Sequence, residues 1–156
     1  MMPLTLPAFD FKIKQALDKT YILDLVRKKY VLLTPEEWVR QHMLHYLIDH
    51  LAYPKGLCCL EKRIYTADRY YRPDIIICNK SGVAKMMVEC KAPYITLTNE
   101  TLGQMMQYNR QLMVDHLVVT NGINHFCWQW EATLNQFRAI SYIPTYQGID
   151  SSSLVC

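Results

Sequence analysis

Two short apolar runs in the middle of the chain predict a pair of neighbouring strands. The runs Ile75–Ile77 and Met86–Val88 are separated by a link, residues 79–82, that contains Asn and Gly. Because these residues favour a tight reversal, the pattern predicts a β-hairpin with strands over 74–78 and 83–91. Side chains alternate along a strand, so the second strand presents two faces, with Met87, Glu89 and Lys91 on one and Met86, Val88 and Cys90 on the other.

Two longer segments have the periodicity of helices. Thr34 is a suitable N-cap and Pro35 a suitable first residue for a helix over 36–51, in which apolar side chains recur three or four residues apart. A second helix is predicted over 98–113. Within it Gln104 and Tyr108 are four residues apart and project from the same face.

The remaining apolar segments complete an α/β arrangement. Strands are expected near 57–65 and at 117–120, and a closing hairpin is expected from strands near 125–130 and 136–140. A short helix is expected around 17–29. The core elements then follow the order αβββαβ, which predicts a mixed β-sheet flanked by helices.

Length and composition indicate one compact domain. With 156 residues the chain is near the commonest domain size. We expect an N-terminal arm with a short helix over 1–32, the main domain over 33–147 and a flexible tail over 148–156. There is no long apolar run and no signal-peptide pattern, which predicts a soluble cytoplasmic protein that does not enter a membrane. The 6 cysteines show no CxxC spacing, so neither a disulfide framework nor a zinc site is expected.

The charge of the chain becomes informative only locally. A net charge of +3 does not by itself indicate nucleic-acid binding. Basic residues and tyrosines are interleaved just before the predicted hairpin: Lys62, Arg63, Tyr65, Arg69, Tyr70, Tyr71 and Arg72. Such a mixture can bind phosphates and stack on bases. The alternative is an ordinary solvated surface, with the tyrosines packed under the hairpin.

Three charged side chains converge at one end of the hairpin. Asp74 begins the first strand, and Glu89 and Lys91 end the second. Charges in an apolar setting are costly unless they are paired or hold a metal ion, and carboxylates suit Mg²⁺ or Mn²⁺. Such an ion can polarise a phosphoryl oxygen and activate water, while a lysine beside it can orient the water or stabilise charge. We therefore predict metal-assisted phosphodiester hydrolysis, with a surface salt bridge as the alternative.

These motifs carry a resemblance to known nucleases. Pro73-Asp74 followed by Glu89-Cys90-Lys91 resembles the PD-(D/E)xK signature of the restriction-endonuclease-like superfamily. Gln104 and Tyr108 resemble the QxxxY motif that follows the ExK strand in a subset of that superfamily. The order of motifs over residues 28–130 is similar to the N-terminal domain family of type I restriction enzyme R subunits. The resemblance implies a restriction-endonuclease-like core.

The resemblance also implies roles for individual residues. Asp74 and Glu89 would bind Mg²⁺ or Mn²⁺ together with the backbone carbonyl of Cys90, and Lys91 would orient the nucleophilic water. Nucleases of this superfamily often add an acid from the first helix, and Glu36 with Arg40 is similar to that pattern. Glu37 stays as the alternative to Glu36, because both glutamates also suit the first turn of a helix. The residues expected to position DNA are Gln104, Tyr108, Arg40 and Arg72.

The predicted function is that of a Mg²⁺-dependent DNA endonuclease domain. No GxxxxGK[ST] motif occurs, so the motor of a complete R subunit is not part of this sequence. Motor, methylase and specificity subunits of a restriction system are expected partners, and a homodimer would supply two sites for two strands. One alternative is a catalytically silent nucleic-acid-binding or protein-interaction module with the same fold. Another is a nuclease that acts on RNA or on DNA repair intermediates.

Overall fold

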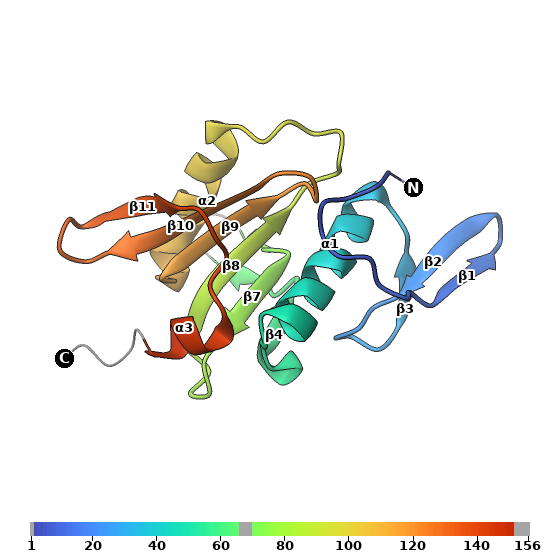
Figure 1. Ribbon diagram of the computed structural model, residues 1–156, viewed down its shortest axis with the longest axis horizontal. Helices are drawn as coiled ribbons and strands as arrows, with labels where there is room; N and C mark the ends of the chain where they lie inside the picture. The colour runs from blue at the N-terminus through green and yellow to red at the C-terminus, as the bar shows by residue number, and fades with distance from the viewer. Residues whose placement is uncertain (1, 66–69, 152–156) are drawn as a thin grey trace.

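A six-stranded mixed β-sheet forms the centre of the molecule (Figure 1). In the computed structural model, which describes residues 2–65 and 70–151, the strand order is β11-β10-β9-β8-β7-β4. The pair β8 and β9 is parallel, and the other neighbouring pairs are antiparallel. The strands are β4 (Cys58–Leu60), β7 (Ile75–Cys78), β8 (Ala84–Cys90), β9 (His116–Thr120), β10 (His125–Glu131) and β11 (Gln136–Ile140). This arrangement confirms the predicted mixed sheet and both predicted hairpins.

Helices cover both faces of this sheet. Helix α1 (Pro35–His45), continued by a π-helical segment (Tyr46–His50), packs on one face, and α2 (Asn99–Leu112) packs on the other. A 3₁₀ turn (Lys55–Leu57) precedes β4, and α3 (Tyr146–Ser151) follows β11. As predicted, Thr34 caps α1: its side-chain oxygen accepts a hydrogen bond from the Glu37 backbone N–H at 3.0 Å.

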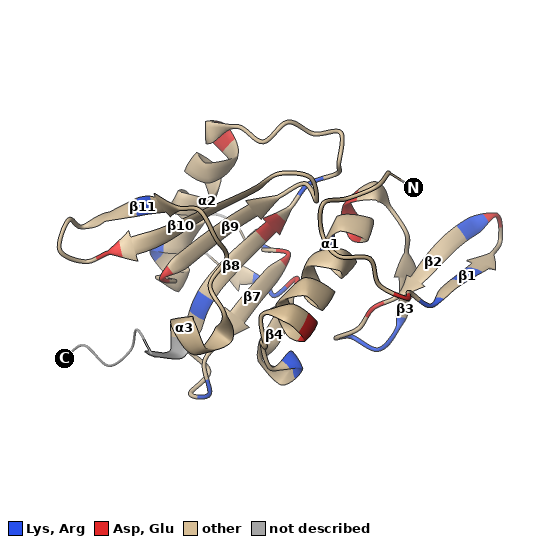
Figure 2. Ribbon diagram, viewed as in Figure 1, with Lys and Arg blue, Asp and Glu red and all other residues tan. Residues whose placement is uncertain are grey.

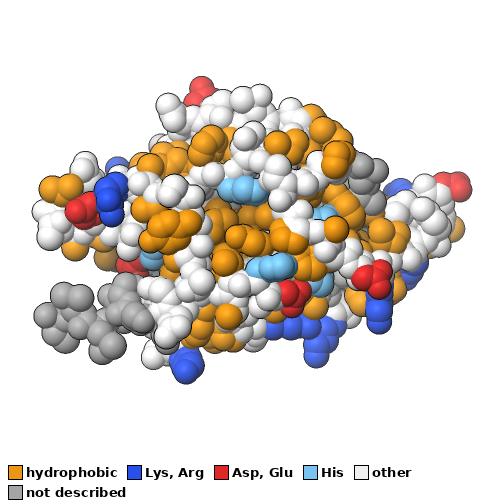
Figure 3. All heavy atoms as spheres, in the orientation of Figure 1, with side chains coloured by type: hydrophobic (Ala, Val, Ile, Leu, Met, Phe, Trp, Pro, Cys, Tyr) orange, Lys and Arg blue, Asp and Glu red, His pale blue; other side chains and the backbone are white. Residues whose placement is uncertain are grey.

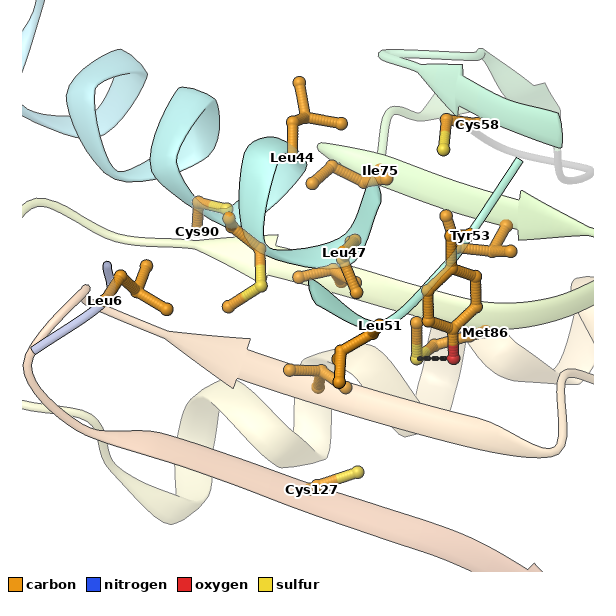
Figure 4. Close-up of a cluster of buried hydrophobic side chains, with 14 of the residues drawn as sticks. Leu6, Leu44, Leu47, Leu51, Tyr53, Cys58, Ile75, Met86, Cys90 and Cys127 are labelled. Atoms are coloured by element: carbon orange, nitrogen blue, oxygen red, sulfur yellow. Dashed lines mark hydrogen bonds between the residues drawn. The ribbon is translucent and has the colours of Figure 1, made fainter. Parts of the chain in front are cut away.

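The two faces of β8 enter two different cores, as the alternation in the sequence predicts. Met86, Val88 and Cys90 are fully buried in the core under α1, whereas Met87 belongs to the core under α2. Figure 4 shows the first of these cores, where side chains of α1 and its π-helical extension meet those of the sheet. This double burial holds the C-terminal end of β8, which bears Glu89, in a fixed position between two helices.

Residues 13–32 form a separate three-stranded sheet, so the helix predicted around 17–29 is wrong. Its strands are β1 (Ile13–Ala16), β2 (Lys19–Leu23) and β3 (Tyr30–Leu32), in the order β1-β2-β3. Leu17 and Asp18 form the β1–β2 turn with φ values of 50° and 58°. Positive φ at both central residues is what a tight hairpin turn requires. The run Thr20-Tyr21-Ile22 is rich in β-branched and aromatic residues, and strand pairing satisfies its backbone.

Two other predicted boundaries also differ from the structure. The single strand expected over 57–65 is divided into β4 and a short β5 (Ile64–Tyr65), because Glu61 between them has a φ of 48°. Strand β5 pairs with β6 (Tyr70–Tyr71). The flexible tail predicted from residue 148 begins inside α3, where Ile149 is buried in the core. Residues 152–156 and Arg69 lie outside the described part of the chain.

The N-terminal arm folds back onto the sheet. The Thr5 backbone N–H donates to the Gly122 carbonyl at 2.8 Å, and Leu6 is buried in the core under α1. Phe9 and Phe11 pack against Trp38, His42 and His45 of α1. On the face shown in Figure 3, hydrophobic side chains and histidines fill the middle and the charged side chains lie towards the edge. Within residues 2–65 and 70–151, no helix has the length and apolarity needed to cross a bilayer.

Candidate active site

The candidate site lies where β7 begins, β8 ends and α1 begins. Asp74 immediately precedes β7, Glu89 and Cys90 are the last residues of β8, and Lys91 follows them. Acidic positions at the start of α1 and at the end of β8 lie on the same side of the molecule (Figure 2). The antiparallel pairing of β7 with β8, with Ile75 opposite Val88, brings Asp74 beside the end of β8.

Asp74 is held between a side chain of α1 and the backbone of β8. Its carboxylate accepts a hydrogen bond from the Arg40 guanidinium on one oxygen and from the Cys90 backbone N–H, at 2.6 Å, on the other. The N–H and C=O of one strand residue point to the same side. The carbonyl of Cys90 is therefore directed towards the Asp74 side of the strand.

Arg40, predicted to position DNA, is a buried neighbour of Asp74. Its side chain is 7% exposed and pairs with Glu37 at 2.6 Å as well as with Asp74. Burial opposes its charge, but the carboxylates of Asp74 and Glu37 outweigh burial and raise the pKa of Arg40. Because an unpaired buried charge is costly, we expect Arg40 to stay paired with these two acids. Its ion pair with Asp74 thereby fixes the position of that carboxylate.

The two glutamates at the start of α1 lie in different surroundings. Glu37 is buried and accepts hydrogen bonds from Arg40 and from Gln41, the latter at 2.8 Å. The Glu36 side chain is half-exposed. The pKa of Glu36 is raised mainly by its partial burial and secondly by the nearby Asp74 carboxylate. The charges of Arg40, which lies 3.4 Å from Glu36, and then of Lys91 act in the opposite direction. Both glutamates therefore pair with Arg40, but Glu36 is half-exposed and is also influenced by Asp74 and Lys91, whereas Glu37 is buried in an internal ion-pair network.

Glu89 receives hydrogen bonds on both carboxylate oxygens. Lys91 donates to one at 2.9 Å, and the hydroxyl of Tyr71 donates to the other at 2.9 Å. Burial, followed by the nearby Asp74 carboxylate, raises the pKa of Glu89, and the two hydrogen bonds partly offset this. Sequence reasoning missed the role of Tyr71. The signal that was available is an aromatic residue three positions before Asp74, in a short strand that leads into the site.

Of the other predicted DNA-positioning residues, Tyr108 is tied to the site through Tyr71. The Tyr108 ring stacks on the Tyr71 ring with centroids 3.4 Å apart and planes 8° apart. Gln104 is exposed one helical turn earlier on α2. Arg72, half-exposed, lies 3.4 Å from Glu61. Tyr108 is thus linked to Glu89 through Tyr71, and Arg72 is linked to Asp74 through Glu61 and Arg40.

The donor set fits a hard divalent cation. Within the described residues, no three His, Cys, Asp or Glu side chains already form a cluster able to hold a metal ion. The carboxylates are instead paired with Arg40, Lys91 and Tyr71. Each carboxylate oxygen has a second lone pair, so an oxygen that accepts one hydrogen bond can still bind a cation. Burial is the main cause of the raised pKa values of Glu36 and Glu89, and the Asp74 carboxylate is the second cause; a cation bound between these acids would offset the second.

Comparison with a solved structure agrees with this fold. The fragment structure of a putative HsdR subunit of a type I restriction enzyme from Vibrio vulnificus YJ016 matches with a TM-score of 0.52 and 14% sequence identity. The match covers 76% of this chain and 25% of that one, so the chain spans about a quarter of the fragment. At this level of identity the likeness concerns the fold alone. A search of curated proteins found no match.

The comparison with protein families is more specific. Residues 35–144 match the family described as the type I restriction enzyme R protein N terminus. The matched segment begins at the first residue of α1 and includes Asp74, the end of β8 and all of α2. It covers well over half of the chain. The chain therefore belongs to the family of N-terminal domains of type I restriction enzyme R proteins.

Proposed function

We propose that this domain is a metal-dependent DNA endonuclease that hydrolyses phosphodiester bonds. The observation that carries the proposal is that two acids meet at one end of the β7–β8 hairpin: Asp74, held by the Cys90 backbone N–H, and Glu89, paired with Lys91. Glu36, at the start of α1, is near enough for its charge to add to the raised pKa of Lys91. A structural salt bridge would need only one acid beside the lysine. The excess of carboxylates is what a divalent cation and a phosphate substrate together require.

Asp74 and Glu89 would hold Mg²⁺ or Mn²⁺, with the Cys90 carbonyl as a further oxygen ligand and Glu36 assisting directly or through water. When bound, such an ion supplies Lewis-acid polarisation of the phosphoryl group and a lower pKa for water. Arg40 and the Cys90 N–H hold the Asp74 carboxylate in place before any ligand arrives. Because these contacts already exist, no free energy is needed to orient the Asp74 carboxylate during the reaction.

Lys91 acts as a cation in this proposal. Burial disfavours its charge, but the Glu89 carboxylate, the hydrogen bond to it and Asp74 outweigh burial and raise the pKa of Lys91. An ammonium with a raised pKa stays protonated at neutral pH, so it cannot accept a proton from water. It would orient the attacking water and stabilise negative charge that develops on the phosphoryl oxygens.

Membership of the family supports a proposal for the substrate and the partners. DNA is the proposed substrate, and motor, methylase and specificity subunits of a type I restriction system are the proposed partners. The second candidate function is a catalytically silent module that binds DNA or protein. It is favoured by the ion pairs of Asp74 and Glu89, which satisfy both side chains without a metal ion. Metal binding separates the two candidates.

The first experiment measures nicking of supercoiled plasmid and of single-stranded circular DNA with Mg²⁺ or Mn²⁺. We expect the parent protein to nick DNA and the Lys91→Ala variant to be slower by at least about 100-fold, the loss typical for one charge-stabilising donor. Mn²⁺ affinity should be retained in Lys91→Ala and lost in Asp74→Asn, as measured by titration calorimetry.

Lys85→Ala is the matched control. Lys85 lies near the start of β8, whereas Lys91 follows its last residue, and Lys85 is also paired with an acid, Asp115, at 2.8 Å. Its replacement should leave nicking unchanged. Equal rates for Lys91→Ala and the parent would refute the assigned role of Lys91. Absence of both Mn²⁺ binding and nicking in the parent would favour the silent module. Mn²⁺ binding without nicking would indicate a nuclease that needs its partner subunits.

A further inference from the structure

A cavity of about 370 Å³ lies next to the candidate active site. One wall is the start of α1, with Thr34, Pro35 and Trp38, and the opposite wall is the loop after β8, with Pro93 and Tyr94. Its volume lies within the range of roughly 300–1,000 Å³ that is usual for small-molecule sites. The rest of the lining comes from the N-terminal segment and from the three-stranded sheet.

The cavity and the carboxylates are built on the same two elements. Pro35 directly precedes Glu36 in α1, and Pro93 follows Lys91 by two residues. A strand whose phosphate lay against Glu36 and Lys91 would therefore have its neighbouring sugar and base at the mouth of this cavity. The loop that carries Tyr94 is held by two hydrogen bonds of 2.9 Å each. The Ile95 N–H donates to the Ala92 carbonyl, and the Asn121 side chain donates to the Ile95 carbonyl.

The described lining is uncharged and mainly apolar, and it includes two aromatic side chains, Trp38 and Tyr94. The Trp38 ring is held by Phe11 and His42, with centroids 5.1 and 4.1 Å away, and Tyr94 is 67% exposed. Further large apolar side chains are exposed around the cavity: Met2, Leu32 and Ile95. Among the residues that the structure describes, no Lys, Arg, Asp or Glu lines the cavity, so a phosphate or carboxylate would meet no basic side chain there. Flat aromatic surfaces without charge suit a ring that stacks.

Two hydroxyl groups give the cavity hydrogen-bonding capacity. The Thr34 oxygen accepts from the Glu37 N–H, which leaves its O–H free to donate. The Thr20 hydroxyl donates to Gln15, which leaves its oxygen free to accept. A donor and an acceptor beside aromatic rings match the edge and the face of a nucleobase.

We infer that this cavity binds an unstacked nucleobase of the DNA strand whose phosphodiester lies at the carboxylates. The inference rests on the proposed nuclease function and specifies its substrate. A base within a duplex is stacked and paired, and its extrusion costs a few kcal/mol. The domain therefore acts on single-stranded or locally melted DNA in preference to intact duplex. Tyr94 and Trp38 are the stacking residues, and Tyr94 is a specificity-determining residue.

The test is oligonucleotide binding in EDTA, measured by fluorescence anisotropy, so that cleavage is not needed for a signal. A single-stranded DNA oligonucleotide should bind more tightly than its duplex. Tyr94→Ala should weaken single-strand binding by at least about fivefold, the lower end of what alanine substitution of one stacking aromatic residue costs. Tyr94→Phe, which keeps the ring, should bind like the parent protein. Circular dichroism checks that each variant is folded.

Tyr142→Ala is the matched control, because Tyr142 is 62% exposed and does not line this cavity. It should bind single-stranded DNA like the parent. A second measurement locates the base: photocrosslinking with a 5-iodouracil oligonucleotide, followed by peptide mapping, should give adducts at Tyr94 or Trp38.

The inference would be overturned by equal affinity for single strand and duplex, by no effect of Tyr94→Ala, or by crosslinks only outside the cavity. Tighter binding of free deoxythymidine monophosphate than of the oligonucleotide would assign the cavity to a small nucleotide and also overturn it. The two proposals fail in different measurements. If the nuclease proposal is wrong, the protein does not nick DNA, whereas if this inference is wrong, the binding experiments in EDTA show it.

Discussion

At the scale of single residues, Tyr71 holds the carboxylate of Glu89, the proposed metal ligand. Its hydroxyl hydrogen bond to the carboxylate lowers the pKa of Glu89 against the opposing effects of burial and Asp74. Tyr71→Phe removes only this bond and keeps the stack on Tyr108. We expect Mn²⁺ affinity at neutral pH to fall by about 10-fold, the lower end for loss of a hydrogen bond to a metal ligand. Titration calorimetry measures the affinity.

The pH dependence distinguishes this role from simple loss of packing. Without the Tyr71 hydroxyl, the pKa of Glu89 rises further, so a larger fraction of Glu89 is protonated in slightly acidic solution. The difference between Tyr71→Phe and the parent should therefore widen at pH 6 and shrink at pH 8.5. Tyr70→Phe, which alters an exposed neighbouring tyrosine, should match the parent at every pH. Equal affinities for Tyr71→Phe and the parent at pH 6 would contradict the assignment.

The residues of the candidate site could be listed from the sequence more readily than their surroundings. Asp74, Glu89 and Lys91 are identifiable because charges stand out against apolar strands. The burial of Arg40 cannot be predicted in the same way, because arginine on a helix is usually exposed. Its position is explained by its pairing with Asp74, which lies next to it only in the folded protein. The different surroundings of Glu36 and Glu37 likewise depend on a partner, Arg27, that lies before the helix. The surroundings of these side chains depend on contacts between segments that are far apart in the sequence, and local sequence patterns do not predict such contacts.

At the scale of elements, the β1–β2 turn is the least relaxed part of the three-stranded sheet. Leu17 is 92% exposed and has a φ of 50°, a conformation that costs most residues about 1–2 kcal/mol. Leu17→Asn places a residue that tolerates positive φ there and should stabilise the protein by about 0.5–1 kcal/mol. Leu17→Val, which adds a β-branch at the same φ, should destabilise it. Urea unfolding measures both, and a lower midpoint for Leu17→Asn would refute the prediction.

The spacing of apolar residues in this segment explains why the sequence predicts a helix there. Leu17, Tyr21 and Leu25 recur at helical spacing, whereas the β-forming run Thr20-Tyr21-Ile22 is only three residues long. Short apolar runs are ambiguous between the two structures. Pairing with β3 decides the outcome, with Ile22 opposite Val31. The strands around Asp74 and Glu89 were easier to predict because a Gly-containing turn joins them and their buried runs are longer.

At the scale of the whole molecule, the domain keeps several histidines neutral by burial. Burial is the main cause of the lowered pKa values of His42, His116 and His125, relative to an ordinary 6.5. Below pH 6.5 these histidines therefore bind protons more readily in the unfolded chain than in the folded protein. The contribution of these histidines to stability is complete above that pH and is lost as the pH falls towards their folded-state values. Glu36 and Glu89 act in the opposite sense, because their pKa values are raised and their protonation favours the folded state.

A histidine variant separates these two opposing effects. We expect the free energy of unfolding to decrease between pH 7.5 and 5.5, by up to about 1.4 kcal/mol per pH unit for each histidine that resists protonation. His42→Gln removes one such group and should flatten this dependence, even if its stability at pH 7.5 is lower because the contact with Phe11 is lost. His50→Gln, an exposed position on the same helical segment, should leave the dependence unchanged. Urea unfolding at both pH values measures each slope. An identical slope for His42→Gln and the parent would mean that the burial of His42 does not contribute to the acid sensitivity of the fold.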